Sequence, residues 1–76
     1  MPTLLNQEGF KFFFYANEHN PRHIHVMHAN GYAKIELGTM RVVRSTLKRV
    51  DRNRALEIAQ VHNATFERKW DEFFHR

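Results

Sequence analysis

The stretch His23-Ile24-His25-Val26-Met27-His28-Ala29-Asn30-Gly31-Tyr32-Ala33-Lys34-Ile35-Glu36-Leu37 decides the fold of this chain. Apolar and polar side chains alternate on both sides of Asn30-Gly31, as expected for two strands that each bury one face. Asn-Gly favours a two-residue hairpin turn because both positions tolerate positive φ. We therefore predict strands over residues 23–29 and 32–37, in a register that places His25 opposite Glu36.

Two further strands flank this hairpin in the sequence. The aromatic run Phe10-Lys11-Phe12-Phe13-Phe14-Tyr15 is rich in residues that favour β-structure and predicts a strand over residues 10–16. After a break at Gly38-Thr39, residues 40–45 predict a fourth strand, although their alternation is poor. The loop between the first two strands contains Asn20-Pro21, which indicates a turn.

The C-terminal third of the chain has helical spacing. Apolar residues recur at steps of three and four and form one stripe, which also includes one asparagine: Leu56, Ala59, Asn63, Phe66, Trp70 and Phe73. This pattern predicts one helix over residues 52–74, with Asp51 as its N-cap. The expected architecture is α+β, in which a small antiparallel sheet of three to four strands packs against one long C-terminal helix. Residues 1–76 form a single domain.

The composition excludes several classes of site. The 76 residues include no cysteine, so disulfides, thiolate zinc sites and cysteine nucleophiles are ruled out. No apolar run is long enough to span a membrane, and the first residues lack the layout of a signal peptide, so we expect a cytoplasmic protein. A domain of this size buries only about 60% of its unfolded surface, which favours a protein partner or a homo-oligomer.

The net charge of +4 is concentrated in one segment. Residues 41–54 contain six basic residues and one acidic residue, Asp51. Such a block attracts phosphates or an acidic partner. The alternative is a solvated surface without a ligand.

Strand parity places a second group of residues on the face of the sheet away from the helix. This outer face collects rings and cations, which can stack on bases and bind phosphates, so we expect RNA or DNA as a ligand. The residues expected to bind nucleic acid, on this face and in the basic segment, are Tyr15, Arg22, Lys34, Arg41, Arg44, Lys48, Arg49 and Arg52. Apolar residues on the same face, such as Phe13, could instead mark a protein interface.

Three interpretations compete for the His23-x-His25 pair, whose side chains leave the strand on the same side. In the first, His23, His25 and Glu18 are catalytic, and the imidazoles transfer protons during RNA cleavage while Lys34 or Arg22 stabilises the developing charge.

In the second, both imidazoles and a carboxylate, Glu18 or Glu36, bind a divalent transition metal. Two histidines are too few to assign such a site, so we expect no cofactor and keep a metal at His23 and His25 as an alternative. In the third, the histidines are structural, with His25 held against Glu36 and His23 closing the loop at Pro21.

The chain also resembles a bacterial family, the domain of unknown function 4160. The resemblance rests on Phe12-Phe13-Phe14-Tyr15, Glu18-x-x-Pro21-x-His23-x-His25-Val26, Ala33-Lys34 and Trp70-x-Glu72-Phe73-Phe74. Genes of this family are often found beside a second small protein, of the 2442 family, in pairs that resemble toxin–antitoxin modules. The resemblance therefore implies a toxin-like protein with a small antitoxin-like partner, and it brings no established mechanism.

Together these observations lead us to expect a basic, toxin-like protein that binds or cleaves nucleic acid through its outer face. The alternative is a non-catalytic regulatory module that binds DNA or protein and pairs with a small cognate partner.

Overall fold

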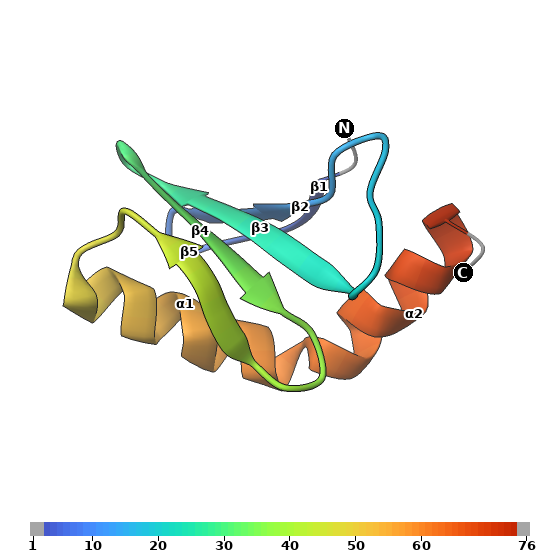
Figure 1. The fold of residues 1–76 in the computed structure, drawn as a ribbon. Helices are drawn as coiled ribbons and strands as arrows, with labels where there is room; N and C mark the ends of the chain where they lie inside the picture. Colours follow the sequence, from blue (N-terminus) through green and yellow to red (C-terminus); the bar gives the residue numbers. More distant parts are fainter. Residues whose placement is uncertain (1–2, 75–76) are drawn as a thin grey trace.

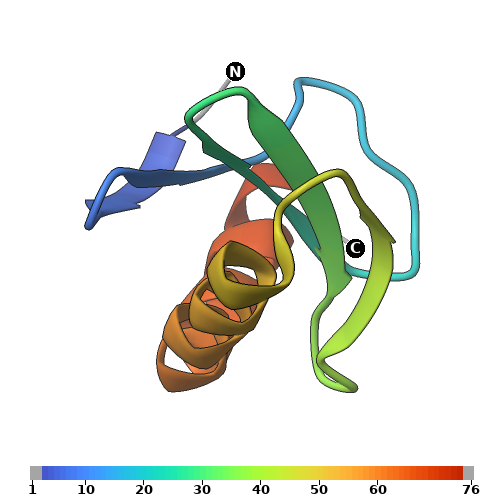
Figure 2. The ribbon, with the colours of Figure 1, turned by 90° about the vertical axis from the view of Figure 1, so that its left-hand side faces the viewer.

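The computed structural model describes residues 3–74, which form one antiparallel sheet and two helices. The strands are joined in sequence order as a meander, and both helices follow the last strand. The elements are β1 (Thr3–Gln7), β2 (Phe10–Phe13), β3 (His23–His28), β4 (Gly31–Glu36), β5 (Arg41–Ser45), α1 (Arg49–Val61) and α2 (Asn63–Phe74). Figures 1 and 2 show the helices on one side of the sheet, while the loop of residues 14–22 swings out on the other.

The α+β class is correct, but the predicted number of strands is wrong, because β1 adds a fifth strand. β1 pairs with β2 through a tight turn in which Glu8 and Gly9 both have positive φ, 55° and 82°. Leu4 and Leu5 of β1 pack against the core. The strand is short and only partly buried, so its hydrophobic pattern gave a weak signal.

The prediction of one long helix over residues 52–74 is also wrong. α1 begins at Arg49, with Lys48 rather than Asp51 as its N-cap, and ends before His62, whose φ and ψ are −102° and 11°. Asn63 then starts α2 and fixes the junction to the sheet. Its Oδ1 accepts a hydrogen bond from the Gly38 N–H at 3.0 Å, in the turn between β4 and β5. The start of α2 is thus tied to the sheet by a contact between distant residues, which helical spacing does not report.

The strand boundaries and the hairpin register need smaller corrections. The strand predicted over 10–16 ends at Phe13, and those predicted over 23–29, 32–37 and 40–45 span 23–28, 31–36 and 41–45. The two-residue turn lies at Ala29-Asn30, where Ala29 has a φ of 52°. His25 therefore pairs with Lys34 and not with Glu36. This register differs from the predicted one by two residues, so every side chain keeps its predicted face.

The core lies between the sheet and the helices. Fully buried Trp70 and Phe66 of α2 and Ile58 of α1 pack against apolar side chains of the three central strands. The core residues of the sheet and of the adjoining loop are Phe10, Phe12, Phe14, Ile24, Val26, Ala33, Ile35 and Leu37. Phe73, which the predicted stripe included, is 48% exposed, and the neighbouring Phe74 packs against the core instead. Within residues 3–74, neither helix has the length and apolar character needed to cross a bilayer.

Candidate functional site

His23 and His25 leave β3 on the face opposite to that of the core residues Ile24 and Val26. The register places Phe13, His25 and Lys34 side by side across β2, β3 and β4. Both histidines are nevertheless only 4% exposed. The loop of residues 14–22 closes over them, so the outer face is less open than the strand pattern suggests.

One carboxylate from this loop bridges the two rings. Glu18, only 7% exposed, places Oε1 2.8 Å from His23 Nε2 and Oε2 2.8 Å from His25 Nε2. The backbone N–H of Tyr15 donates a further hydrogen bond to Oε2 at 2.9 Å. We refer to Glu18, His23 and His25 as the histidine–glutamate cluster.

The outward ring nitrogens also have partners. His23 Nδ1 donates to the carbonyl oxygen of Pro21 at 2.8 Å, and His25 Nδ1 lies 2.8 Å from the hydroxyl of Tyr32. A carbonyl oxygen can only accept, so both nitrogens of His23 face acceptor groups. A hydrogen bond between His23 Nε2 and Glu18 Oε1 therefore requires one proton between these two atoms. His25 can donate from Nε2 to Glu18 and accept from the Tyr32 hydroxyl.

Aromatic rings surround the cluster and exclude water from it. The ring of Phe13 stacks on His25 with centroids 5.5 Å apart, and the ring of Tyr15 lies 4.5 Å from the same imidazole. On the other side, the centroid of His23 lies 5.1 Å from that of Trp70 in α2. His23 thus sits where the outer face meets the helical layer, while His25 lies wholly on the outer face.

Burial and hydrogen bonding shift the acidities of these groups. Burial raises the pKa of the Glu18 carboxyl, but the Tyr15 N–H and the two imidazoles outweigh it and hold that pKa below its ordinary value. Burial lowers the pKa of His25, against the opposing pull of the Glu18 carboxylate. Burial also raises the pKa of Tyr32. These shifts favour an ionised Glu18, a neutral His25 and a protonated Tyr32 at neutral pH.

The structure separates the eight residues predicted to bind nucleic acid. Tyr15, Lys34 and Arg44 share the outer face, with Lys34 directly opposite Arg44 across β4 and β5. Two others are held in ion pairs, Arg22 with Asp71 at 2.7 Å and Arg41 with Glu36 at 3.3 Å.

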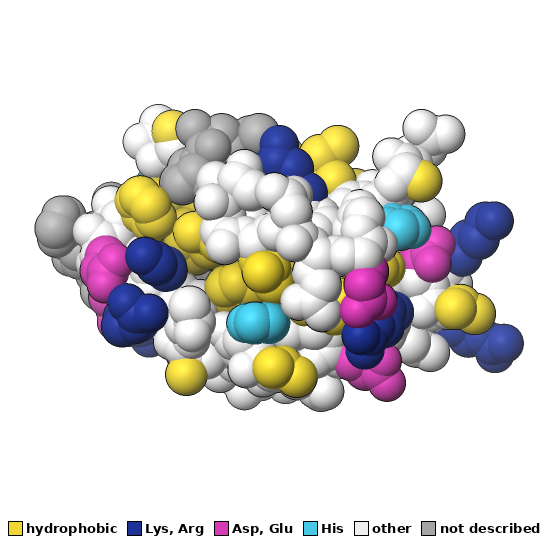
Figure 3. Space-filling model, turned by 180° about the vertical axis from the view of Figure 1, so that it is seen from behind, with side chains coloured by type: hydrophobic (Ala, Val, Ile, Leu, Met, Phe, Trp, Pro, Cys, Tyr) yellow, Lys and Arg dark blue, Asp and Glu magenta, His cyan; other side chains and the backbone are white. Residues whose placement is uncertain are grey.

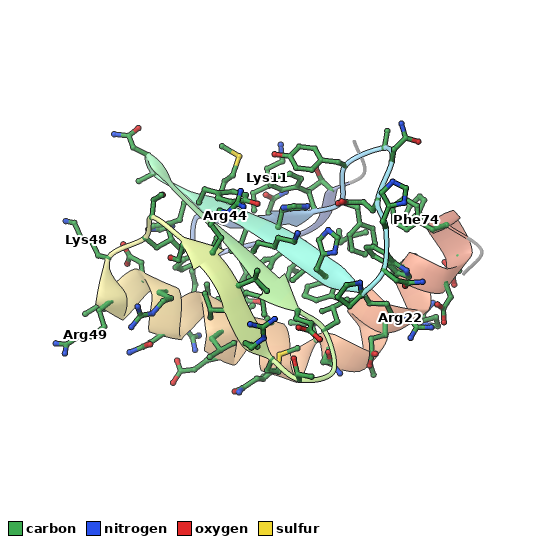
Figure 4. The ribbon with its side chains drawn as sticks, in the orientation of Figure 1. Lys11, Arg22, Arg44, Lys48, Arg49 and Phe74 are labelled. Carbon is green, nitrogen blue, oxygen red and sulfur yellow. The ribbon has the colours of Figure 1, made fainter. Side chains whose placement is uncertain are left out.

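The remaining three, Lys48, Arg49 and Arg52, lie at the start of α1. Figure 4 shows Lys48 and Arg49 at one end of the molecule and Arg22 near the other, with Lys11 and Arg44 over the sheet between them.

Two residues of the site were not assigned to it from the sequence. Tyr32 supplies the hydroxyl that contacts His25, and Lys11 lies on the outer face with its Nζ 5.7 Å from the centroid of Phe13. Strand alternation is enough to put both on the face of His25, but the contact between Tyr32 and His25 also requires the correct register, which alternation does not give. The predicted pairing of His25 with Glu36 is wrong because it used the incorrect register. In the structure Glu36 forms an ion pair with Arg41.

The cluster also has the donor set of a metal site. One ligand atom from each of Glu18, His23 and His25 can be chosen so that all three lie within 4.8 Å of one another. Over residues 3–74 this is the group of histidine and carboxylate side chains that meets that geometry. The predicted pair of histidines thus acquires a third donor, and of the two carboxylates considered from the sequence it is Glu18.

Comparison with known proteins gives one family match. A family model described as Domain of unknown function (DUF4160) matches residues 9–71, which include the histidine–glutamate cluster and most of both helices. No curated protein and no solved structure matches the chain.

Proposed function

The chain belongs to the DUF4160 family, and we propose that it binds single-stranded nucleic acid through the outer face of its sheet. The observation that carries this proposal is a group of three cations on that face, Lys11, Lys34 and Arg44, beside the Tyr15 ring. None of the three cations is in an ion pair with another of the described residues, whereas Arg22 and other surface arginines are.

The chemistry of this face suits a flexible polyanion. Unpaired cations attract phosphates, and an exposed ring can stack on any base, which together give affinity with little sequence preference. Tyr15 is 44% exposed, and Met27 on the neighbouring strand is equally exposed. In the view from behind, Figure 3 shows hydrophobic patches and a histidine in the middle, and basic side chains next to acidic ones at the left and right.

Binding is better supported than cleavage. A general base must reach the hydroxyl whose proton it removes. Here both Nε2 atoms contact Glu18, and both imidazoles are almost fully buried. We therefore assign Glu18, His23 and His25 to the organisation of the face and not to proton transfer during RNA cleavage.

The toxin-like role implied by the family resemblance is compatible with this proposal if the chain acts by binding RNA and not by cleaving it. The chain would act by occupying RNA, and a small antitoxin-like partner with an acidic surface would compete for Lys11, Lys34 and Arg44. In this arrangement the same face serves both ligands, so RNA and partner should exclude each other.

The direct test is a binding titration with a fluorescently labelled oligouridine RNA, at several salt concentrations. Lys34→Glu with Arg44→Glu reverses two charges on the outer face, and Lys48→Glu with Arg49→Glu makes the same change at the start of α1. We expect the first double variant to weaken binding at least tenfold. It should also flatten the slope of log K against log salt by roughly 0.7 for each phosphate that the variant no longer neutralises.

The matched control should bind nearly as the parent protein does. If the control loses more affinity than the outer-face variant, the RNA-binding surface lies at the start of α1 and the proposal is wrong. A parent protein that binds no RNA at low salt would also refute it.

A further inference from the structure

We propose that the histidine–glutamate cluster is a binding site for a divalent transition-metal ion such as Zn²⁺. The ligands are Nε2 of His23, Nε2 of His25 and the Glu18 carboxylate. The inference does not depend on nucleic-acid binding, since it rests on a different set of side chains from Lys34 and Arg44.

The distances between the donor atoms are close to those between the ligand atoms of a bound ion. Two ligands that lie 2.0–2.1 Å from a tetrahedral ion are roughly 3.3 Å apart. In this structure each Glu18 oxygen lies 2.8 Å from an imidazole nitrogen. The carboxylate would have to withdraw by about half an ångström to accommodate an ion. Both histidines are on β3, whereas Glu18 is in the loop of residues 14–22, so the movement falls on the loop.

The outward ring nitrogens are held as they are in metal sites. A ligating histidine usually donates its second N–H to a carbonyl, a carboxylate or another oxygen, which fixes the ring and its tautomer. His23 Nδ1 donates to the Pro21 carbonyl, and His25 Nδ1 lies within hydrogen-bond distance of the Tyr32 hydroxyl. Both rings therefore present Nε2 to the same carboxylate, that of Glu18.

An ion would also replace a proton that the cluster now holds. The proton between His23 and Glu18 would be released to solvent, which leaves a carboxylate and a neutral His23 with its proton on Nδ1. His25 would keep its one proton but carry it on Nδ1 instead of Nε2, and would donate it to the Tyr32 oxygen. Binding of one ion would therefore release one proton, and both imidazoles would coordinate as neutral groups.

The donor types select the class of ion. Two imidazole nitrogens and one carboxylate suit Zn²⁺, Co²⁺ or Ni²⁺, whereas Ca²⁺ and Mg²⁺ prefer sites built from oxygen atoms. Three protein ligands leave a coordination position for water or another small molecule, which is typical of sites that are not purely structural.

The test uses untagged protein titrated with Co²⁺, followed by visible absorption, and with Zn²⁺, followed by calorimetry and native mass spectrometry. The expected result is one ion per chain, and a Co²⁺ spectrum of low coordination number. Glu18→Gln removes the ligating carboxylate, and Glu36→Gln makes the same change at the other carboxylate considered from the sequence. Glu18→Gln should lower the metal affinity more than about 100-fold, which exceeds the loss typical of mutations in residues that only support the ligands. Glu36→Gln should bind the metal as the parent does.

Glu18→Gln is preferred to an alanine variant because an amide can fill the place of the carboxylate and keep the fold. Circular dichroism checks that it does so, and His25→Gln repeats the test at a second ligand. A parent protein that binds neither Co²⁺ nor Zn²⁺ at one per chain overturns the proposal. So does a folded Glu18→Gln or His25→Gln protein with the affinity of the parent.

Discussion

Replacing Glu18 by alanine should detach the loop of residues 14–22 from the sheet. The carboxylate meets three polar groups, the Tyr15 N–H and the Nε2 atoms of His23 and His25, and it is almost fully buried. Without it, these groups lose their partner, and they stay buried unless the loop opens. Truncation of one member of a buried charged set typically costs roughly 3–5 kcal/mol.

We expect a value near the lower end of that range, about 3 kcal/mol, because an opened loop lets water reach the imidazoles. A domain of 76 residues has a total unfolding free energy of roughly 4–11 kcal/mol. The alanine variant should therefore lose a large part of its stability. For a domain of this size, a loss of about 3 kcal/mol lowers Tm by roughly 12–24 °C.

Glu18→Gln should behave differently, and the hydrogen bonds show why. Its amide nitrogen can replace Oε1 and donate to His23 Nε2, which accepts when His23 keeps its proton on Nδ1 for the Pro21 carbonyl. Its amide oxygen can replace Oε2 and accept from the Tyr15 N–H and from His25. Each of the three groups that contacted the carboxylate then keeps a hydrogen-bond partner, so the loss should stay within about 1 kcal/mol.

Urea unfolding followed by circular dichroism, in buffer with a metal chelator, measures both variants. Glu57→Gln is the control, since it removes a carboxylate from an exposed ion pair with Arg54 and should change stability by less than about 0.5 kcal/mol. If Glu18→Ala is as stable as this control, the carboxylate does not hold the loop. If Glu18→Gln is as unstable as Glu18→Ala, the assignment of donors and acceptors in the cluster is wrong.

Other predictions concern pH, the core and the helix junction. The pKa of His25 lies below its ordinary 6.5 and that of Glu18 below 4.5, so the unfolded chain binds more protons than the folded one. Metal-free protein should thus lose stability as pH falls below about 6.5, and further below about 4.5; urea midpoints that stay flat or rise would contradict this. Trp70→Ala should cost about 3–5 kcal/mol because the ring is fully buried, and thermal unfolding should show a Tm lowered by roughly 12–40 °C. Asn63→Ala should cost about 1 kcal/mol in urea unfolding because the Gly38 N–H loses its acceptor; the exposed Asn53→Ala in α1 should cost nothing.

The faces of the central strands could be predicted from the sequence, whereas their register could not. Alternation reports only which side a residue occupies, and a shift of two residues leaves that unchanged. The Asn30-Gly31 pair suggested a turn one residue later than the true one. In the structure Gly31 is in β4, where a Cβ would lie 2.5 Å from Cδ2 of Leu47. The glycine thus allows a close approach by a distant residue, and this use is indistinguishable in sequence from a turn.

The candidate site could likewise be predicted only in part from the sequence. Glu18, His23 and His25 could be selected because strand parity and the short loop bring them to one end of the sheet. Their burial could not be predicted, since it depends on how the loop of residues 14–22 folds back. A loop has no periodicity from which its path could be inferred. The contacts of the Glu18 carboxylate with His23 and His25 join this loop to a strand, so they could not be inferred either.

The cost of the cluster bears on its role. Buried ionic groups are seldom more stable than apolar side chains of the same size, so a small domain gains little stability from placing two imidazoles and a carboxylate there. The cluster does fix the position of Tyr15, because Glu18 accepts a hydrogen bond from the Tyr15 N–H and His25 packs against the Tyr15 ring. Tyr15 is the exposed ring of the proposed nucleic-acid surface. The state of the cluster, whether protonated or bound to a metal ion, would therefore set the placement of that ring, although the cluster itself is buried beneath the surface that is proposed to bind nucleic acid.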